Sequence, residues 1–209
     1  MSKLLYIESS PRKDRSASIE VAQSFVSAFQ DANTGNQVES LDLWDATLPE
    51  FDGDRINAKY RVMHGESPTT EEALAWEEIT NIVARFKNAD HYLFSLPMWN
   101  FSIPYKLKHY IDLICQPGLT WSFSPETGYQ GLVTGRSATL ILARGGEYSS
   151  SAEAGAMDFQ KSYMEMVLGF MGFQDINTVL VEPTLTDADT KGKTLAAMKE
   201  KATNIAKQL

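Results

Sequence analysis

Short apolar runs alternate with stretches of helical periodicity along nearly the whole chain, and this alternation constrains the fold most. Five runs are expected to form strands: Lys3–Glu8, Gln37–Leu43, Asp90–Leu96, Ser137–Ala143 and Asp175–Val181. The fourth, SATLILA, is short, continuous and apolar, which is typical of a strand covered on both faces. Strands that alternate with helices form parallel sheets joined by right-handed crossovers. The pattern therefore predicts an α/β fold around a five-stranded parallel sheet.

Between these runs, apolar residues recur three and four positions apart, which predicts amphipathic helices. The expected helices are Ser16–Phe29, Thr70–Lys87, Leu107–Ile114, Phe159–Phe170 and Leu195–Leu209. Two further segments, Trp44–Pro68 and Gln116–Arg136, are expected to be long loops. Loops of that length in a compact domain are usually functional or disordered. The second holds three large aromatic residues, too many for a disordered tether.

Composition limits the class of protein. A chain of 209 residues is expected to form one domain, residues 1–209. Its net charge of −8 leaves no basic stripe for nucleic acid and no polybasic segment for a membrane surface. A cytoplasmic location is the default expectation, because no apolar run near the N-terminus has the length of an export signal. Cys115 fits a buried, inert thiol better than a catalytic one, and no Cys/His cluster has metal-ligand spacing.

In an open parallel sheet, ligands bind beyond the carboxyl ends of the strands, where the strand order reverses. The first loop at such an end is SSPRKDRSAS, residues 9–18, which leads into a helix N-terminus. Free N–H groups and the helix dipole favour a phosphate there, and Ser10, Ser16 and Ser18 can add hydroxyl donors. The simpler alternative is a serine N-cap beside a solvated basic loop.

The same loop is basic in an acidic protein, since it carries Arg12, Lys13 and Arg15. It lacks the glycine pattern of the dinucleotide-binding turn and the pattern of the P-loop. The loop therefore argues against a dinucleotide-binding fold of that type and against a P-loop nucleotidase.

The second loop is PMWNF, residues 97–101. Met98 and Trp99 offer a soft surface and a flat one, suited to stacking on an aromatic ring. Asn100 carries both a donor and an acceptor, suited to the edge of a heterocycle. The alternative is a core plug in which Asn100 caps the next helix.

The third loop is ARGGEY, residues 143–148. Its paired glycines let the backbone approach a ligand closely, and Arg144 beside a ring edge would stabilise negative charge there. The alternative is an ordinary glycine turn. Together the three loops describe a ligand with a phosphate at one end and a flat, hydrogen-bonding heterocycle at the other, which FMN fits.

At these residues the sequence resembles the FMN-dependent NAD(P)H azoreductases, a family of flavodoxin-like quinone reductases. The segments LLYIESSPR, RSASIE, PMWNFSIPYKLKHYIDLICQPGLTWSF, GLVTGRSATLILARGG and LGFMGFQDI follow the order and spacing of that family. The resemblance covers essentially the whole chain. It implies a flavodoxin-like three-layer sandwich with strand order 2-1-3-4-5, bound FMN, and NADH or NADPH as electron donor.

The resemblance also implies roles for individual positions. Four would hold the phosphate: Ser10, Ser16, Ala17 and Ser18. Four would line the ribityl chain and the ring: Met98, Trp99, Asn100 and Phe101. Five would border the ring's polar edge or lie near it: Ala143, Arg144, Gly145, Gly146 and Tyr148.

The chain departs from the family at two of these positions. Trp99 stands where the family more often has Tyr, and it keeps the stacking face. Ala143 stands where Ser or Thr is more common, so one hydroxyl contact to the ring is lost.

Members of the family are homodimers with the active site at the subunit interface. The resemblance therefore implies a substrate pocket for quinones or azo compounds lined by Phe51, Trp121 and Phe123, in part across the interface. The alternative for these aromatics is packing within one chain.

The implied reaction is a ping-pong transfer of two electrons as hydride, from NAD(P)H to FMN and then to the acceptor. No catalytic acid or base is nominated, because His64, His91 and His109 lie at positions that suit structural or solvated roles. Three alternatives stay open: a flavodoxin-type FMN electron carrier, a hydrolase or transferase that uses the phosphate loop, and an FAD-dependent quinone reductase.

Overall fold

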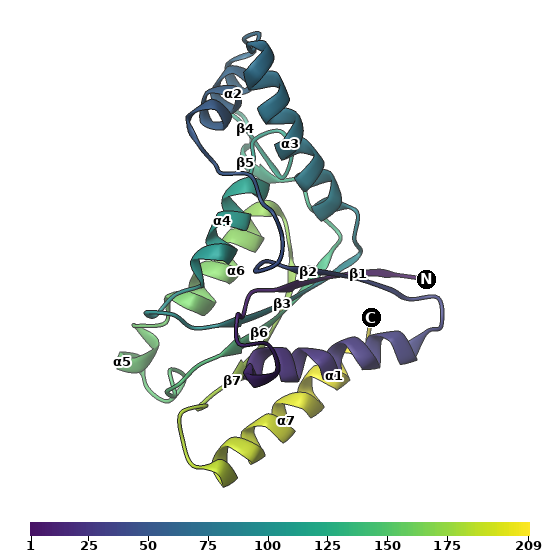
Figure 1. The fold of residues 1–209 in the computed structure, drawn as a ribbon, viewed down its shortest axis with the longest axis vertical. Coiled ribbons are helices and arrows are strands. Elements are labelled where there is room, and N and C mark those ends of the chain that lie inside the picture. Colours follow the sequence, from purple (N-terminus) through teal and green to yellow (C-terminus); the bar gives the residue numbers. More distant parts are fainter.

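A five-stranded parallel sheet forms the centre of the computed structural model, which describes all residues from 1 to 209 (Figure 1). Its strand order is β2-β1-β3-β6-β7. The bounds of these strands are Lys3–Glu8 for β1, Gln37–Asp42 for β2, His91–Pro97 for β3, Ser137–Ala143 for β6 and Asp175–Val181 for β7. This is the predicted arrangement, and only the numbers differ, because two further short strands precede β6 in the chain. The predicted fold class is confirmed.

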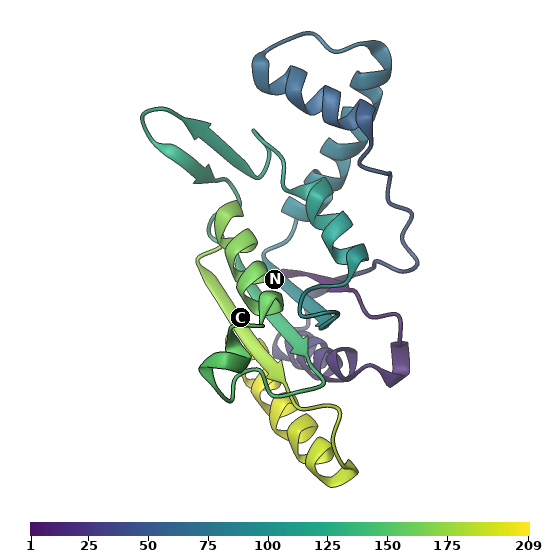
Figure 2. The ribbon, with the colours of Figure 1, turned by 90° about the vertical axis from the view of Figure 1, so that its left-hand side faces the viewer.

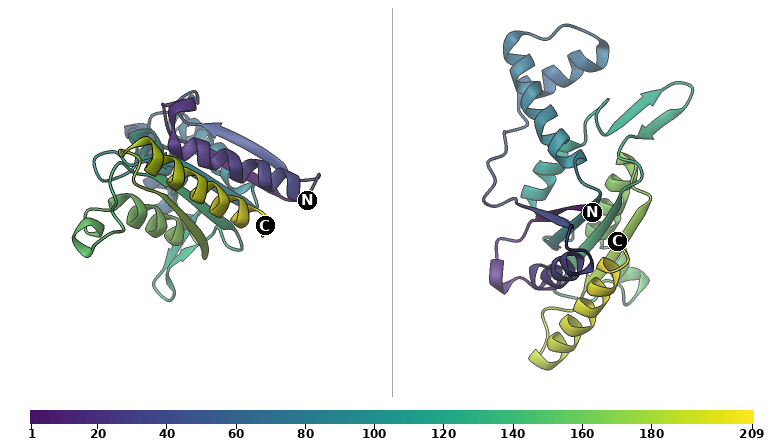
Figure 3. Two further views of the ribbon diagram at one scale, coloured as in Figure 1. Left: turned by 90° about the horizontal axis from the view of Figure 1, so that it is seen from below. Right: turned by 90° about the vertical axis from the view of Figure 1, so that its right-hand side faces the viewer.

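Helices cover both faces of the sheet and make it the middle of three layers. On one face lie α1 (Ala17–Ala32) and α7 (Ala188–Ala206), side by side in Figure 3. On the other face lie α3 (Thr70–Lys87), α4 (Tyr105–Ile114) and α6 (Phe159–Met171). All five predicted helices are present, and α7 begins seven residues before the predicted Leu195 because Asp187 caps it through the N–H of Thr190.

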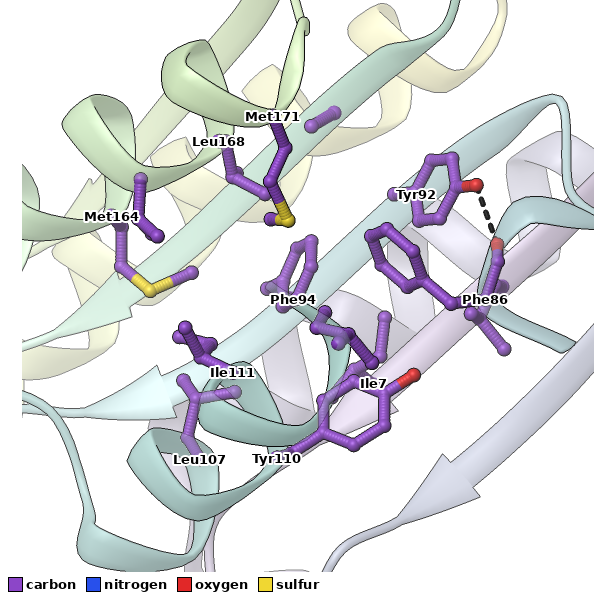
Figure 4. Packing of buried hydrophobic residues seen from close by; sticks show 14 of the residues in the cluster. Ile7, Phe86, Tyr92, Phe94, Leu107, Tyr110, Ile111, Met164, Leu168 and Met171 are labelled. Carbon is purple, nitrogen blue, oxygen red and sulfur yellow. Dashed lines mark hydrogen bonds between the residues drawn. The ribbon is translucent and has the colours of Figure 1, made fainter. Parts of the chain in front are cut away.

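The two faces have separate apolar cores, as a doubly covered sheet requires. The larger core lies under α3, α4 and α6 and includes the side chains labelled in Figure 4. There the hydroxyl of Tyr92 donates to the carbonyl of Phe86 at 2.5 Å, so the one polar atom of that ring is satisfied inside the core. None of the helices combines the length and the apolar content that crossing a bilayer demands.

The prediction of a loop at Trp44–Pro68 is wrong for its central part, which forms α2 (Gly53–His64). Asp52 caps the start of this helix through the N–H of Arg55, and Gly65 ends it in the left-handed conformation at φ 68°. Only Ala58 of α2 is buried, so the helix has no broad apolar stripe that periodicity would reveal. It packs on α3 and projects from the sheet (Figure 2).

The predicted loop at Gln116–Arg136 contains an antiparallel hairpin of β4 (Trp121–Ser124) and β5 (Gly128–Gly131). Its aromatic side chains pack on Phe170 of α6, with ring centroids 5.4 Å apart for Trp121 and 5.6 Å for Tyr129. The base of the hairpin meets the end of α6, where the N–H of Val133 donates to the carbonyl of Met171 at 2.8 Å. A Cβ on Gly131 would lie 2.3 Å from the backbone nitrogen of Gly172.

This contact makes Gly131→Ala the most damaging small substitution in the hairpin. The atoms that a methyl group would meet are backbone on the opposite segment, so they cannot rotate away, and overpacking of this kind typically costs about 1–3 kcal/mol. We expect the free energy of unfolding, measured in urea, to fall by that amount. Gly169→Ala is the matched control: it lies in α6 with open space around it, and alanine should stabilise that helix by about 0.5–1 kcal/mol. Equal effects of the two substitutions would contradict this packing.

Candidate functional site

A cavity of about 250 Å³ opens at the carboxyl edge of the sheet. The loop after β1 contributes Ser10, Arg12 and Arg15, and Ser16 and Ala17 follow at the start of α1. The loop after β3 contributes Pro97, Met98 and Trp99. The loop after β6 contributes Ala143 and Gly145. The structure thus brings residues from all three predicted loops to one cavity.

The end of the cavity beside α1 has the features of a phosphate site. Ser16 is the N-cap of α1, and its Oγ lies 3.5 Å from the N–H nitrogen of Ile19 and 3.1 Å from Oγ of Ser18. The N–H groups of Ala17 and Ser18 are the first in the helix and therefore have no acceptor within it. Ser10 Oγ lies 3.4 Å from the N–H nitrogen of Arg12 and faces the cavity. Free donors and the positive end of α1 suit an anion here.

Three cations line the same cavity: Arg12, Arg15 and, from α7, Lys191. None of them forms an ion pair within the chain, whereas all five other arginines do. Lys13 differs from the expectation for this loop. Its ammonium bridges the carboxylates of Glu8 and Asp42, so it fastens the loop to β1 and β2 and is not free for a ligand.

The loop after β3 is a tight reversal. Trp99 and Ser102 exchange both backbone hydrogen bonds, at 2.9 and 3.0 Å, and the two residues between them have positive φ, 47° at Asn100 and 70° at Phe101. This is the conformation of a two-residue hairpin turn in which glycine usually takes the second position. Phenylalanine there is uncommon and strained. Strain of this kind concentrates at functional sites.

Two aromatic residues pack beside the ring of Trp99. Its ring centroid lies 5.9 Å from that of Trp44 and 6.4 Å from that of Tyr105. Trp44 Nε1 donates to the carbonyl of Ser9 at 3.0 Å, which ties the loop after β1 to the same cluster. Trp44 is not among the residues predicted from the sequence. Its position directly after a strand, at the edge where ligands bind, was the available signal.

The loop after β6 is joined to the loops on either side of it. The N–H of Met98 donates to the carbonyl of Ala143 at 2.8 Å, and the N–H of Leu185 donates to the carbonyl of Gly145 at 3.1 Å. Thr184 and Leu185, in the loop after β7, also line the cavity, and this fourth loop is not among the three predicted from the sequence. Leu185 is 84% exposed, an unusual state for a leucine on a cavity rim.

The guanidinium of Arg144 does not lie at this cavity, contrary to the expectation of a charge beside a ring edge. It is fully buried, 2.6 Å from the carboxylate of Asp158 and 3.2 Å from that of Glu182. Burial alone would raise the pKa of Glu182, but the N–H groups of Ser149 and Tyr148 and the charge of Arg144 hold that pKa below its ordinary value. Glu182 is therefore charged at neutral pH and offsets the charge of the guanidinium.

Several other predicted residues lie beside the cavity without lining it: Ser18, Asn100, Phe101, Gly146 and Tyr148. Tyr148 lines a neighbouring cavity of about 350 Å³ together with Arg144 and Asp158. Its ring lies 6.4 Å from that of Phe101, edge to face, so the loops after β3 and β6 also meet there.

The three predicted substrate residues do not meet within one chain. Phe51 lines a cavity of about 610 Å³ with Ser102 and Tyr105, next to the loop after β3. Trp121 and Phe123 line a separate cavity of about 360 Å³ between the hairpin and α2.

The cavity at the carboxyl edge is lined by no carboxylate, imidazole or thiol. Of the histidines, His91 bonds Ser137 Oγ through Nδ1 at 2.7 Å, and His109 bonds the carbonyl of Pro49 through Nε2 at 2.8 Å. Burial lowers the pKa of His91, which suits a structural role. The arrangement is suited to binding and orienting an anionic, flat ligand, and it contains no acid–base pair of its own.

Comparison with known proteins agrees with the fold described above. A family profile described as a flavodoxin-like fold matches residues 2–206. A protein of Desulfotalea psychrophila named FMN-dependent NADH:quinone oxidoreductase is 58% identical over 209 residues, which is 100% of this chain and 98% of that protein. A protein of Nitratidesulfovibrio vulgaris with the same name is 46% identical, with 99% of each chain covered.

Two solved structures are similar over their full length. An azoreductase from Bacillus anthracis gives a TM-score of 0.91 at 30% identity, with 100% of both chains covered. An FMN-dependent NADH-azoreductase from Bacillus anthracis, solved in complex with FMN, gives a TM-score of 0.86 at 29% identity, with 99% of this chain and 100% of that chain covered.

The strained turn gives a prediction about stability. Left-handed backbone costs a residue with a Cβ about 1–2 kcal/mol, and glycine avoids that cost. Because the Phe101 side chain is 46% exposed, Phe101→Gly should leave the free energy of unfolding unchanged or raise it by up to about 1 kcal/mol. Phe123→Gly is the control: it removes a similarly exposed aromatic from a strand with ordinary φ and should destabilise. Urea unfolding measures both, and a clear loss of stability in Phe101→Gly would remove the case for strain.

Proposed function

The chain belongs to the family of proteins with the flavodoxin-like fold, and from that membership we propose that it is an FMN-dependent NADH:quinone oxidoreductase. Its cofactor is FMN, its electron donor is NADH, and its acceptors are quinones and aromatic azo compounds. The observation that carries the proposal is one cavity at the carboxyl edge, which is lined by the N-terminus of α1 with its free N–H groups, by three unpaired cations and by the turn that holds Trp99.

The residues present fit FMN. We propose that Ser10, Ser16 and the free N–H groups of Ala17 and Ser18 bind its phosphate, supported by the cations around them. When bound, FMN supplies the two-electron chemistry that accepts hydride from NADH and delivers it to the acceptor.

The ring would rest on the loop after β3, with Trp99 as its flat support and Asn100 at its edge. At 250 Å³ the cavity is smaller than ligand pockets of about 300–1,000 Å³, which suits a cofactor whose ring lies at the mouth, open to the donor and acceptor.

Backbone groups replace Arg144 as the stabilisers of negative charge on the ring. The N–H groups of Gly145 and Gly146 donate to no acceptor within the chain. Free N–H groups aimed at developing charge are effective stabilisers because they are already oriented before the reaction. We propose that these two N–H groups fulfil that role, which also explains why a glycine-rich turn is needed at this position.

We propose that NADH and the acceptor occupy the open face of the ring in turn, which is a ping-pong sequence. We also propose a homodimer in which the hairpin of one subunit completes the acceptor pocket of the other. In support, Phe51 already lies beside the loop after β3, whereas Phe123 and Tyr129 near the hairpin tip are still 58% and 63% exposed within one chain.

The test is made on the purified protein. It should be yellow, release FMN on denaturation and oxidise NADH when a quinone is present. Initial rates at several quinone concentrations should give parallel double-reciprocal lines, and light scattering should give about twice the 23.3 kDa of one chain. A protein that takes up FMN but does not oxidise NADH would be an electron carrier. A colourless protein that binds no added FMN would overturn the proposal.

Lys191 provides a sharper test of the phosphate site. Lys191→Gln should raise the dissociation constant of FMN about 10-fold, or about 1.4 kcal/mol, at low salt. The difference should shrink as salt is added, because screening weakens the lost attraction. Lys193→Gln is the matched control, since that lysine is on the same helix, 77% exposed and paired with Asp189 outside the cavity. Equal FMN affinity in both variants would show that Lys191 does not face the phosphate.

A further inference from the structure

A single buried cation lies where the loops around the ring meet. The Nε of Arg144 donates to Oε1 of Gln160 at 3.1 Å, and Nη1 donates to Oε2 of Glu182 at 3.2 Å. Its Nη2 lies 2.6 Å from Oδ2 of Asp158. The Arg144 side chain is fully buried, and a buried charge is tolerated only when it is paired and hydrogen-bonded. Two hydrogen bonds, from Nε and Nη1, and an ion pair at Nη2 supply this, with Asp158 and Gln160 at the start of α6 and Glu182 directly after β7 as the partners.

Through Glu182 this cluster holds the glycine loop. The Glu182 carboxylate that accepts the hydrogen bond from Arg144 also accepts hydrogen bonds from the N–H of Tyr148 at 2.9 Å and the N–H of Ser149 at 3.1 Å. At the other end of the loop, the carbonyl of Arg144 accepts the N–H of Thr184 at 2.9 Å and its hydroxyl at 2.8 Å. The two glycines between these anchors are therefore fixed on both sides, although neither makes a hydrogen bond through its own N–H.

Through α6 the cluster also holds the turn after β3. Oε1 of Gln160 accepts the hydrogen bond from Nε of Arg144. Its Nε2 donates to the carbonyl of Leu96 at 3.3 Å, in β3 just before that turn. The N–H of Phe159, the first residue of α6, donates to the carbonyl of Phe101 at 3.0 Å. Asp158 caps the same helix with Oδ1 and faces Arg144 with Oδ2.

We propose that Arg144 is a positioning residue for the flavin: its buried guanidinium fixes the glycine loop against the turn at Trp99–Ser102, so that both keep the spacing the ring requires. It acts through Glu182, Gln160 and Asp158 and touches no atom of the cofactor. The inference rests on the proposed function, because it takes the ligand of this cavity to be FMN.

Buried charge of this kind is an unusual way to stabilise a fold. Apolar side chains of the same volume often serve equally well or better, since two carboxylates and a guanidinium must lose water. What the cluster adds is direction, because a planar guanidinium donates hydrogen bonds only at fixed angles. A direction-dependent contact between two ligand loops suits a site whose donors must already be in place before the ring binds.

Binding at the two ends of the cofactor should respond differently to loss of Arg144. The phosphate end depends on α1 and the three cations, none of which contacts the cluster. Loss of Arg144 should therefore weaken FMN and riboflavin by the same factor, because riboflavin has the ring and lacks the phosphate. Loss of Lys191 should weaken FMN alone. A general loss of folding would not produce this separation in the fraction of protein that remains folded.

The experiment titrates the full-length, flavin-free protein with FMN and with riboflavin and follows the quenching of flavin fluorescence. The variants are Arg144→Gln, Arg144→Lys and Glu182→Gln. The matched control is Arg136→Gln, at the opposite end of β6, where Arg136 pairs with Asp90 at 2.5 Å. Thermal unfolding of each variant identifies a temperature at which all are folded.

We expect Arg144→Gln to raise both dissociation constants about 10-fold, which corresponds to about 1.4 kcal/mol, with their ratio unchanged. Arg144→Lys should be intermediate, Glu182→Gln should resemble Arg144→Gln, and Arg136→Gln should resemble wild type. If Arg144→Gln does not fold, Arg144→Lys and Glu182→Gln decide the matter by the same two constants.

Two results would overturn the proposal: wild-type affinity for both flavins in the folded Arg144 and Glu182 variants, or a loss confined to FMN, which would assign the cluster to the phosphate. Wild-type protein that binds neither flavin would instead overturn the proposed function, and this inference with it.

Discussion

The common direction of five hydrogen-bonded strands is the constraint on which the rest of the structure depends. Pro97 of β3 pairs with Ala143 of β6, and Ala143 pairs with Val181 of β7, so these strands end at the same level. Their following loops must then emerge side by side, although they are separated by dozens of residues in the chain. No loop contains a complete site, and the sheet register brings the parts together.

Each loop at this edge contributes a different kind of group to the cavity. The loop after β1 and the start of α1 present hydrogen-bond donors and positive charge, the turn after β3 presents a flat surface, and the loop after β6 presents bare backbone. Each is held by a contact to its neighbour: Trp44 to Ser9, Met98 to Ala143, and Leu185 to Gly145. The site is therefore as rigid as these hydrogen bonds make it. Its precision comes from backbone pairing more than from the lining side chains.

The sequence was sufficient for the sheet, for the five helices that cover it and for the edge of the sheet at which the cavity opens, because each rests on local periodicity or on a residue's position at a strand end. It was insufficient where a charged side chain can pair either with a ligand or with another residue of the protein. Lys13 and Arg144 are cations in ligand loops, and only the positions of distant carboxylates decide that both are used within the protein. Helix α2 was missed because one buried residue leaves no periodic signal. Lys191 was missed because α7 approaches the cavity from the far end of the chain.

The three unpaired cations have a consequence for the rate of capture. The chain carries a net charge of −8, and FMN and NADH are both anions. At physiological salt the general repulsion extends only about 8 Å before it is screened, whereas the attraction of the cavity acts at contact. The electrostatic energy of an approaching anion therefore first rises slightly outside the protein and then falls at the cavity. Added salt should speed the entry of FMN while also speeding its escape, the reverse of the steering seen when a whole protein face opposes the charge of its ligand.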